Sequence, residues 1–313
     1  MSGHHHHSHA PIDLPQGSET ARLMRRATLA AVAIASLLIV AKLIVWWRSD
    51  SLAILSSLTD SFFDLLTSVI NLIAVRYALK PADDDHRFGH TSIEDIAGLA
   101  QGAFISASML LIILQSLERL FNPEPIAHEQ LGMAVSMFGM IATSLLVAYQ
   151  TYVARRTRSL IVLADRLHYA GDIAFNLGVL LALAASLYLG WSWADPLVAL
   201  LIASAVLWSS RSIGLRAYHN LMDREMPETE KEKIYAVLRN DVDLHGYHNL
   251  KTRFAGTKPF IQFHAEIAAG LSFRDAHAII DRIEQRLQEM FPGADVIIHP
   301  DPIEPRVPQA YDA

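Results

Sequence analysis

Residues 27–47 read ATLAAVAIASLLIVAKLIVWW and contain one charged side chain, that of Lys42. An α-helix of about 20 apolar residues spans the hydrocarbon core of a bilayer, so this stretch predicts a membrane-spanning helix. Further long apolar segments follow at residues 52–79, 93–117, 130–153, 161–189 and 194–215. The sequence therefore predicts an α-helical membrane protein with six transmembrane helices.

The composition agrees with this class of protein. Of the 313 residues, 52% are hydrophobic and 19% are charged, and the mean hydropathy is +0.25. An ordinary soluble domain is more polar. The net charge of −6 argues against a broad nucleic-acid-binding surface. The chain has 0 Cys, which excludes disulfides, thiolate metal sites and a cysteine nucleophile.

Basic residues are unevenly distributed over the predicted loops. One side of the membrane would carry Arg22, Arg25, Arg26, Lys80, Arg87, Arg155, Arg156, Arg158, Arg211 and Arg216. The opposite side would carry Arg48 and Arg119. Because basic loops stay on the cytoplasmic side, both termini are expected in the cytoplasm.

The composition changes after about residue 221. Helical patterns cover residues 227–240 and 272–291, and strand patterns cover residues 244–256, 260–269 and 294–301. The second strand alternates Ile261, Phe263, Ala265 and Ile267 with polar residues. The second helix is expected to bury Phe273, Ala276, Ile280, Ile283, Leu287 and Met290. The order αββαβ predicts a small α+β domain with its helices on one face of a sheet.

The expected domain organisation has four parts. Residues 1–18, which include His4, His5, His6, His7 and His9, are interpreted as a purification tag and disordered segment. Residues 19–220 form the six-helix transmembrane domain, and residues 221–305 form a cytoplasmic metal-binding domain. The Pro-rich residues 306–313 are expected to be a disordered tail.

Two predicted spans carry acidic residues and an imidazole at helical spacing. Asp60 and Asp64 lie four residues apart in the second span, as do His168 and Asp172 in the fifth. Residues i and i+4 share a helix face. A carboxylate deep in hydrocarbon costs at least about 2.5 kcal/mol, so these groups need a partner. Three oxygens and one nitrogen suit tetrahedral Zn²⁺, although pairing with basic side chains is the alternative. Asp165 could line the access path to this site.

Further potential ligands lie outside the spans. Asp83, His86 and His90 are spaced to chelate a metal from the loop PADDDHRFGH, although acidic loops are usually just solvated. The C-terminal domain holds His245, His248, His264, His277, His299 and Asp301. His299 and Asp301 are two residues apart on a strand and so point to one face. His128 and His219 have no partner in the sequence pattern, and no role is assigned to them.

Taken together, these features resemble the cation diffusion facilitator family. The resemblance covers roughly residues 20–305. It rests on the two pairs in the spans, on the loop Asp85-His86-Arg87-Phe88-Gly89-His90 and on the terminal Val296-Ile297-Ile298-His299-Pro300-Asp301-Pro302. The resemblance implies a homodimeric exporter of a bacterial inner membrane that exchanges cytoplasmic Zn²⁺ for H⁺, and a ferredoxin-like fold for the cytoplasmic domain.

The same resemblance assigns the ligands. Asp60, Asp64, His168 and Asp172 match the family's transport site, and Asp83, His86 and His90 match its loop site. In the cytoplasmic domain, one ion of a binuclear site would be bound by His248, His264 and Asp301, and the other by His277, His299 and Asp301. The family often has a Lys where this chain has Ser92, so an ion pair between that Lys and Asp223 is not expected here.

Two other functions remain open at this point. An intramembrane metalloenzyme is disfavoured because the sequence lacks His-Glu-x-x-His and the ligand set leaves no open position for catalysis. A membrane-anchored metal sensor is disfavoured because an anchor needs no charged ligands at depth. The residues do not determine the metal, since the set suits Zn²⁺ and Cd²⁺ and could admit Fe²⁺ or Mn²⁺. The leading prediction is a metal transporter and not an enzyme.

Overall fold

The computed structural model describes residues 18–49, 52–121, 130–189, 191 and 193–303. These residues form two compact units, of which one ends at Leu221 and the other begins at Met222. The tag, the C-terminal tail and His128 lie outside the described residues, so their predicted properties stay predictions.

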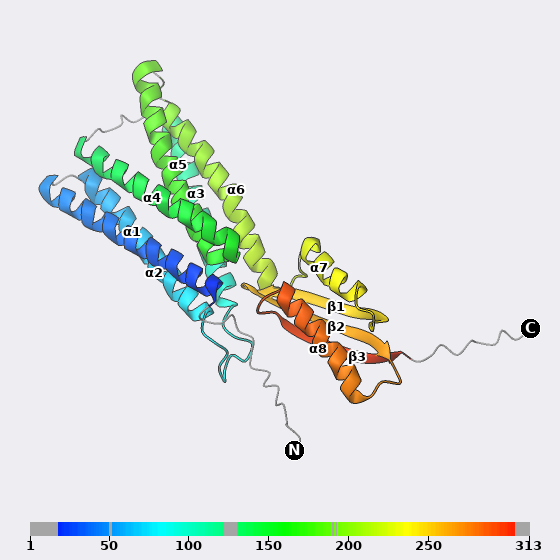
Figure 1. Cartoon of the computed structure of the whole chain (residues 1–313). Coiled ribbons are helices and arrows are strands. Elements are labelled where there is room, and N and C mark those ends of the chain that lie inside the picture. Colours follow the sequence, from blue (N-terminus) through cyan, green and yellow to red (C-terminus); the bar gives the residue numbers. More distant parts are fainter. Residues whose placement is uncertain (1–17, 50–51, 122–129, 190, 192, 304–313) are drawn as a thin grey trace, which may run out of the picture. The chain divides into compact units, whose positions relative to one another are not determined.

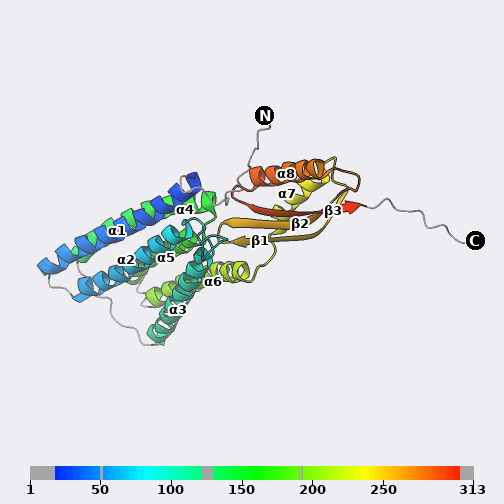
Figure 2. The ribbon, with the colours of Figure 1, turned by 90° about the horizontal axis from the view of Figure 1, so that it is seen from below.

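The first unit consists of six long helices that run side by side (Figures 1 and 2). They are α1 (Glu19–Ser49), α2 (Leu52–Ala78), α3 (Ile93–Phe121), α4 (Gln130–Thr157), α5 (Leu160–Leu189) and α6 (Ala194–Leu221). Within the described residues, five of them are long and apolar enough to cross a membrane, namely α1, α2, α3, α4 and α6. The predicted segments thus correspond to helices, although α1 begins well before residue 27 and α6 continues beyond residue 215 to Leu221.

Close packing of small residues brings some of these helices together. α3 packs along α6, and α1 packs along α2. A Cβ atom at Gly102 of α3 would lie 3.4 Å from the backbone nitrogen of Gly214 on α6. A Cβ atom at Gly178 of α5 would lie 2.7 Å from Cδ1 of Ile202 on α6. A larger residue at Gly178 would therefore force the side chains of Val198 and Ile202 to shift, whereas Gly102 lets the backbones of α3 and α6 come close together.

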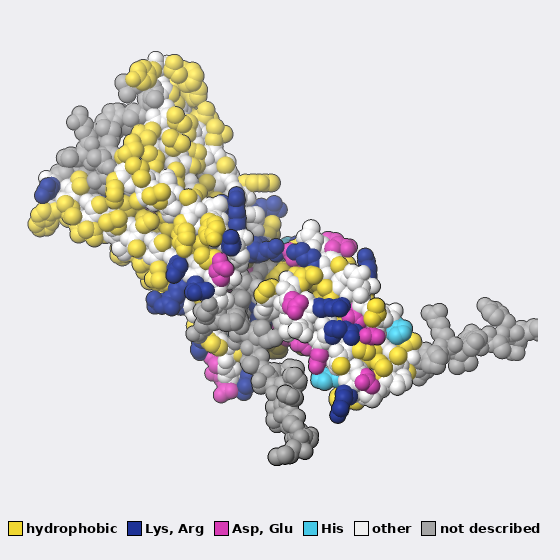
Figure 3. Space-filling model, in the orientation of Figure 1, with side chains coloured by type: hydrophobic (Ala, Val, Ile, Leu, Met, Phe, Trp, Pro, Cys, Tyr) yellow, Lys and Arg dark blue, Asp and Glu magenta, His cyan; other side chains and the backbone are white. Residues whose placement is uncertain are grey.

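The outer surface of the helical unit is apolar. Hydrophobic side chains cover most of the face shown in Figure 3, and many large ones are exposed to the surroundings. Exposed examples are Leu37, Ile44, Phe62, Ile73, Leu111, Leu145, Leu181 and Trp208. A soluble protein rarely exposes so large a continuous apolar surface, which is the surface expected of helices in lipid.

The second unit is a small α+β domain. It consists of α7 (Glu228–Arg239), β1 (Gly246–Ala255), β2 (Lys258–Ala268), α8 (Phe273–Met290) and β3 (Asp295–Ile303). The sheet has the order β1-β2-β3, in which β1 pairs antiparallel with β2 and β2 pairs parallel with β3. Both helices cover one face of the sheet (Figure 2). The predicted order αββαβ is confirmed.

The core of this unit lies between the helices and the sheet. Ile261, Phe263, Ala265 and Ile267 of β2 are all buried, as their alternation predicts. The predicted buried face of α8 is partly wrong, because Ile279 joins Ile283 and Leu287 in the core. Phe273 is 89% exposed and Met290 is 42% exposed. Both lie in the terminal turns of α8, beyond the central turns that pack on the sheet.

Candidate metal sites

A cavity of 520 Å³ lies among the helices of the first unit. Most of its lining is apolar or weakly polar, with residues such as Ile105, Met109 and Val206. Its charged or titratable lining residues are Lys42, Asp60, Asp64, His168, Tyr169 and Asp172. The four residues predicted to form the transport site therefore face one common chamber.

Three of these four side chains converge. Nε2 of His168 lies 3.0 Å from Oδ1 of Asp64 and 3.9 Å from Oδ2 of Asp172. One potential ligand atom from each residue lies within 4.8 Å of the other two. His168 and Asp172 share a face of α5 because they are four residues apart, and Asp64 reaches them from α2. Two oxygens and a nitrogen could thus bind a single cation.

Asp60 lies farther from this group. It lines the cavity and sits one turn before Asp64 on α2, but it is more exposed and is not among the three clustered residues. A side-chain rotation or a small shift of α2 would be needed to bring its carboxylate to the ion. Its assignment as the fourth ligand stays a prediction.

A layer of buried hydrogen bonds lies beside the cavity. The hydroxyls of Ser68 on α2 and Tyr169 on α5 are 2.7 Å apart. Asn71 donates to Asp165 at 2.9 Å, and Gln150 of α4 donates to the other oxygen of Asp165 at 2.5 Å. Asp165 is 1% exposed and is not a lining residue of the cavity, so the expectation that it lines an access path is wrong in this conformation. It connects three helices instead.

The sequence pattern gave Lys42 no role, yet it lies in the same chamber. Its Nζ donates to the backbone oxygen of Ser57 at 3.0 Å and to Oγ of Ser61 at 2.7 Å. A lone lysine in the middle of an apolar span was the signal that could have identified it, because an intramembrane charge faces the protein interior and marks a functional position.

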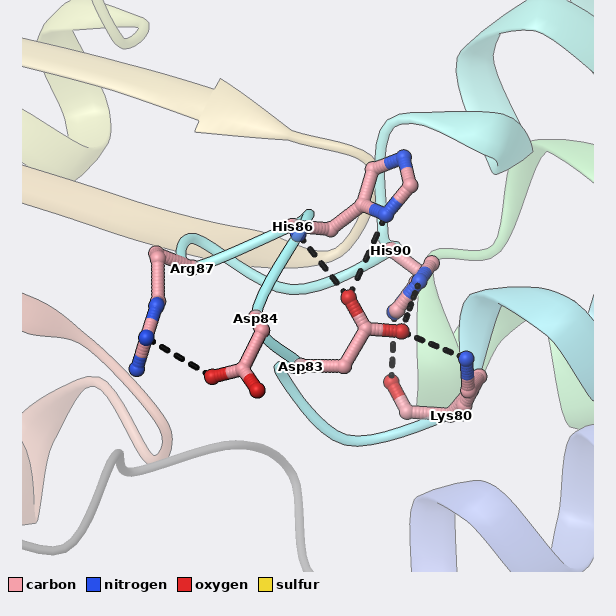
Figure 4. Close-up of polar contacts among 6 residues, drawn as sticks. All are labelled: Lys80, Asp83, Asp84, His86, Arg87 and His90. Carbon is pink, nitrogen blue, oxygen red and sulfur yellow. Dashed lines mark hydrogen bonds and ion pairs between the residues drawn. The ribbon is translucent and has the colours of Figure 1, made fainter.

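The second group of potential ligands forms the loop between α2 and α3 (Figure 4). Asp83 lies at its centre, 3.3 Å from Nδ1 of His86 and 3.3 Å from Nε2 of His90. The backbone N–H of His86 also donates to Asp83 at 2.8 Å. Gly89 has a φ of 87°, a conformation that glycine adopts without strain, and this turn folds His90 back toward Asp83. The three predicted loop ligands are therefore brought together.

Lys80 occupies part of this loop group. Its ammonium donates a hydrogen bond to the Asp83 carboxylate, and this bond holds the pKa of Asp83 well below its usual value. The same bond raises the pKa of Lys80. Asp83 is thus a carboxylate at neutral pH and can bind a cation, but a metal ion would have to displace the Lys80 ammonium.

The third group lies on the sheet of the second unit. His248 of β1, His264 of β2 and His299 of β3 are directly opposite one another in the strand register. Asp301 follows His299 by two residues and so projects from the same face. Its carboxylate lies 3.0 Å from Nε2 of His248, 2.9 Å from Nδ1 of His264 and 3.3 Å from Nε2 of His299. The hydrogen bond with His264 is the main cause that lowers the pKa of Asp301.

A β-bulge in β1 lies directly after His248, the histidine that β1 contributes to this group. The register between β1 and β2 shifts by one residue between His248 and Lys251. Asn249 adopts a φ of 53°, in the left-handed region. Bulges often lie next to functional sites, where they re-aim a side chain.

The remaining histidines of this unit are not part of the group. His277 on α8 lies 3.5 Å from Asp281 on the same helix and is not among the clustered ligands within the described residues. Its assignment to a second ion with His299 and Asp301 stays a prediction. His245, and His219 of α6 in the helical unit, also lie outside the three groups. Asp223 forms an ion pair with Arg253 at 2.8 Å.

Comparisons with known proteins identify the family of this chain. Residues 28–222 match the family description "Cation efflux transmembrane domain", and residues 226–303 match the ZT dimer family, described as "Cation efflux protein, cytoplasmic domain". The chain belongs to the cation efflux family. The resemblance to cation diffusion facilitators is thereby confirmed over almost the whole chain.

Individual relatives of this family cover nearly the same length. The cation-efflux pump FieF of Escherichia fergusonii is 43% identical over 281 residues, which are 90% of this chain and 93% of the relative. The FieF proteins of Shigella flexneri and Escherichia coli K12 match with the same identity and coverage.

Two solved structures of cytosolic domains are similar to about a quarter of this chain. The metal-bound C-terminal domain of the CzcD transporter from Thermotoga maritima is 29% identical, with a TM-score of 0.24, and covers 26% of this chain and 100% of that domain. The cytosolic domain of a cation diffusion facilitator family protein is 28% identical, with a TM-score of 0.23, and covers 25% of this chain and 98% of that domain.

Proposed function

We propose that this cation efflux protein exports divalent metal cations, Zn²⁺ foremost, in exchange for protons and by alternating access. The observation that carries the proposal is the convergence of Asp64, His168 and Asp172 in a cavity among apolar helices. Charged groups at membrane depth are costly and mark ion pathways. A cation that passes through the cavity would compensate these charges while it is bound.

The donor set favours zinc without excluding its neighbours. With Asp60 as the fourth ligand, the site offers three carboxylates and one imidazole, a combination that suits tetrahedral Zn²⁺. Cd²⁺, Fe²⁺ and Mn²⁺ are alternative substrates, because affinity order alone does not decide selectivity.

Proton exchange follows from the chemistry of the same ligands. Imidazole and carboxylate groups bind a metal only when deprotonated, so metal and protons compete for the site. A site that releases its metal can take up protons instead of standing charged in a low dielectric. The return step of the transport cycle would then carry protons in the opposite direction.

The architecture that we propose has six spans, including α5, and places both termini in the cytoplasm of a bacterial cell, with the spans in its inner membrane. Residues 19–220 form the transmembrane domain, and residues 221–305 form a ferredoxin-like cytoplasmic domain with a binuclear site. Two copies form a homodimer, as the name of the matched ZT dimer family suggests. Metal ions bound at the loop and cytoplasmic groups would either sense the cytoplasmic metal concentration or pass on to the transport site.

Metal flux in proteoliposomes tests the proposal. The purified full-length protein should move Zn²⁺ across the bilayer, and Cd²⁺, Fe²⁺ and Mn²⁺ measured in parallel should rank below it or beside it. Metal binding without flux would favour a membrane-anchored sensor. Substrate turnover without flux would favour an intramembrane metalloenzyme. Either result would overturn the proposal.

A further inference from the structure

Lys42 is placed so that its charge acts on the transport cavity without occupying the ligands. It lines the cavity together with Asp60, Asp64, His168 and Asp172. Its two hydrogen-bond acceptors, Ser57 O and Ser61 Oγ, are both neutral. Among the described residues, no carboxylate lies within ion-pair distance of its Nζ. The ammonium therefore leaves the carboxylate oxygens available to a metal ion.

The charge of Lys42 is nevertheless close enough to matter. Asp60, Asp64 and Asp172 line the same cavity as the Lys42 side chain. In a partly buried site, the interaction between charges is several times stronger than in bulk water. An ammonium at this position stabilises the metal-free cavity, which holds three carboxylates, and repels a divalent cation that binds there.

We propose that Lys42 is a resident cation that weakens metal binding at the transport site and so speeds metal release. The inference rests on the proposed function of this cavity. An efflux transporter must release its ion on the far side, and a site of very high affinity would release it slowly. A fixed positive charge beside the ligands lowers affinity without removing a ligand, so the geometry of coordination is preserved.

The same contacts also allow a purely structural role. Because Lys42 is on α1 and both acceptors are on α2, the side chain could simply clamp the two helices together. The two roles predict opposite changes in affinity. Loss of a clamp would disorder α2 and weaken metal binding, whereas loss of a repelling charge would strengthen it.

The experiment uses the full-length protein with His86, His90, His248, His264, His277 and His299 replaced by Ala, so that the membrane site alone reports. Zn²⁺ affinity is measured in detergent and Zn²⁺ flux in proteoliposomes for this parent and for Lys42→Met, Lys42→Arg and Ser61→Ala. Lys42→Met should lower the Kd and KM for Zn²⁺ about tenfold or more and should lower the maximal rate.

The two control variants separate charge from anchoring. Lys42→Arg retains the charge, and Ser61→Ala removes one of the two hydrogen bonds but leaves the charge in place, so both should stay within about threefold of the parent. An unchanged or raised Kd in Lys42→Met would overturn the inference, as would an equal effect in Ser61→Ala. Lys42→Gln supplies the same loss of charge if Lys42→Met does not insert. A parent that neither binds nor transports Zn²⁺ would instead overturn the proposed function.

Discussion

Asp64 connects α2 to the two α5 residues of the proposed transport site. Its Oδ1 lies 3.0 Å from Nε2 of His168 on α5. Asp64→Ala should reduce Zn²⁺ flux by about 100-fold or more, since even outer partners of a metal site change affinity by about 10–100-fold. Zinc binding at the cytoplasmic group should persist.

Ser108→Ala is the matched control for this variant. Ser108 lines the same cavity but is not among the clustered ligands. Its replacement should leave the flux close to that of the wild type. Wild-type flux in Asp64→Ala would show that the ion does not pass through this group.

His168 contributes the only nitrogen among the residues assigned to the transport site. Imidazole favours Zn²⁺ over harder cations such as Mn²⁺, which prefer oxygen ligands. His168→Asp should therefore raise the ratio of Mn²⁺ flux to Zn²⁺ flux, measured side by side in proteoliposomes. An unchanged ratio would mean that the geometry of the site, and not the type of ligand, selects the metal.

The roles of single residues were the hardest feature to predict from the sequence. The i, i+4 spacing correctly predicted that His168 and Asp172 share a face, because that spacing is a property of one helix. Lys42 was overlooked because its partners, Ser57 and Ser61, lie on another helix, 15 and 19 residues away. Asp165 was misjudged for the same reason, since its donors come from α2 and α4.

At the level of elements, the pattern of hydrophobic residues was sufficient to predict where the helices and strands lie in the sequence. Long apolar runs predicted α1 to α6, and the period of two predicted β2, because both patterns are set by local geometry. The buried face of α8 was only partly predicted, since which turns of a helix are covered depends on the extent of the sheet beneath it. The row of three histidines depends on strand register, which the sequence alone did not supply.

One ion-pair cluster connects α8 to the segment after α7 and makes a prediction about pH. Arg282 donates to both oxygens of Asp241, at 2.9 and 3.2 Å, and Arg286 donates to Asp241 at 3.2 Å. Burial by itself would raise the pKa of Asp241, but the hydrogen bonds and charge of the arginines hold it below its usual value. A carboxylate with a lowered pKa in the folded state stabilises the fold above its unfolded pKa of about 3.9.

Acidification should therefore loosen this part of the cytoplasmic unit. The contribution of Asp241 is complete at neutral pH and is lost as the pH falls below about 4 and through the lower pKa of the folded state. Asp241→Asn should reduce stability at pH 7 by about 1–3 kcal/mol. It should also show a smaller further loss than the wild type on acidification, as measured by hydrogen exchange of α8 in the full-length protein. Parallel pH profiles of the two proteins would contradict the assignment.

At the level of the whole molecule, the proposed cycle couples metal movement to protons. In the variant that lacks the loop and cytoplasmic histidines, zinc affinity should fall as the pH drops from about 7 to about 5.5, because protons compete with the metal for the imidazole and carboxylate ligands. In proteoliposomes, an inward proton gradient should drive Zn²⁺ out against its own gradient. Affinity that is constant over this pH range would make the protein a facilitator without proton coupling.

The bulge in β1 has a consequence for how this family member tolerates changes in chain length. His248 pairs with His264 and Lys251 pairs with Gln262, so three steps along β1 correspond to two steps along β2. β1 therefore contains one residue more than its pairing with β2 requires. Deletion of Asn249 would let every other pair of the ladder persist, with His248 still opposite His264. It would also remove a residue held at a positive φ of 53°. The shortened strand should therefore fold at least as stably as the original, yet hold the imidazole of His248 at a different angle to Asp301. If zinc affinity of the sheet group fell without loss of thermal stability, Asn249 would serve to orient His248 toward the metal and would not be needed for folding.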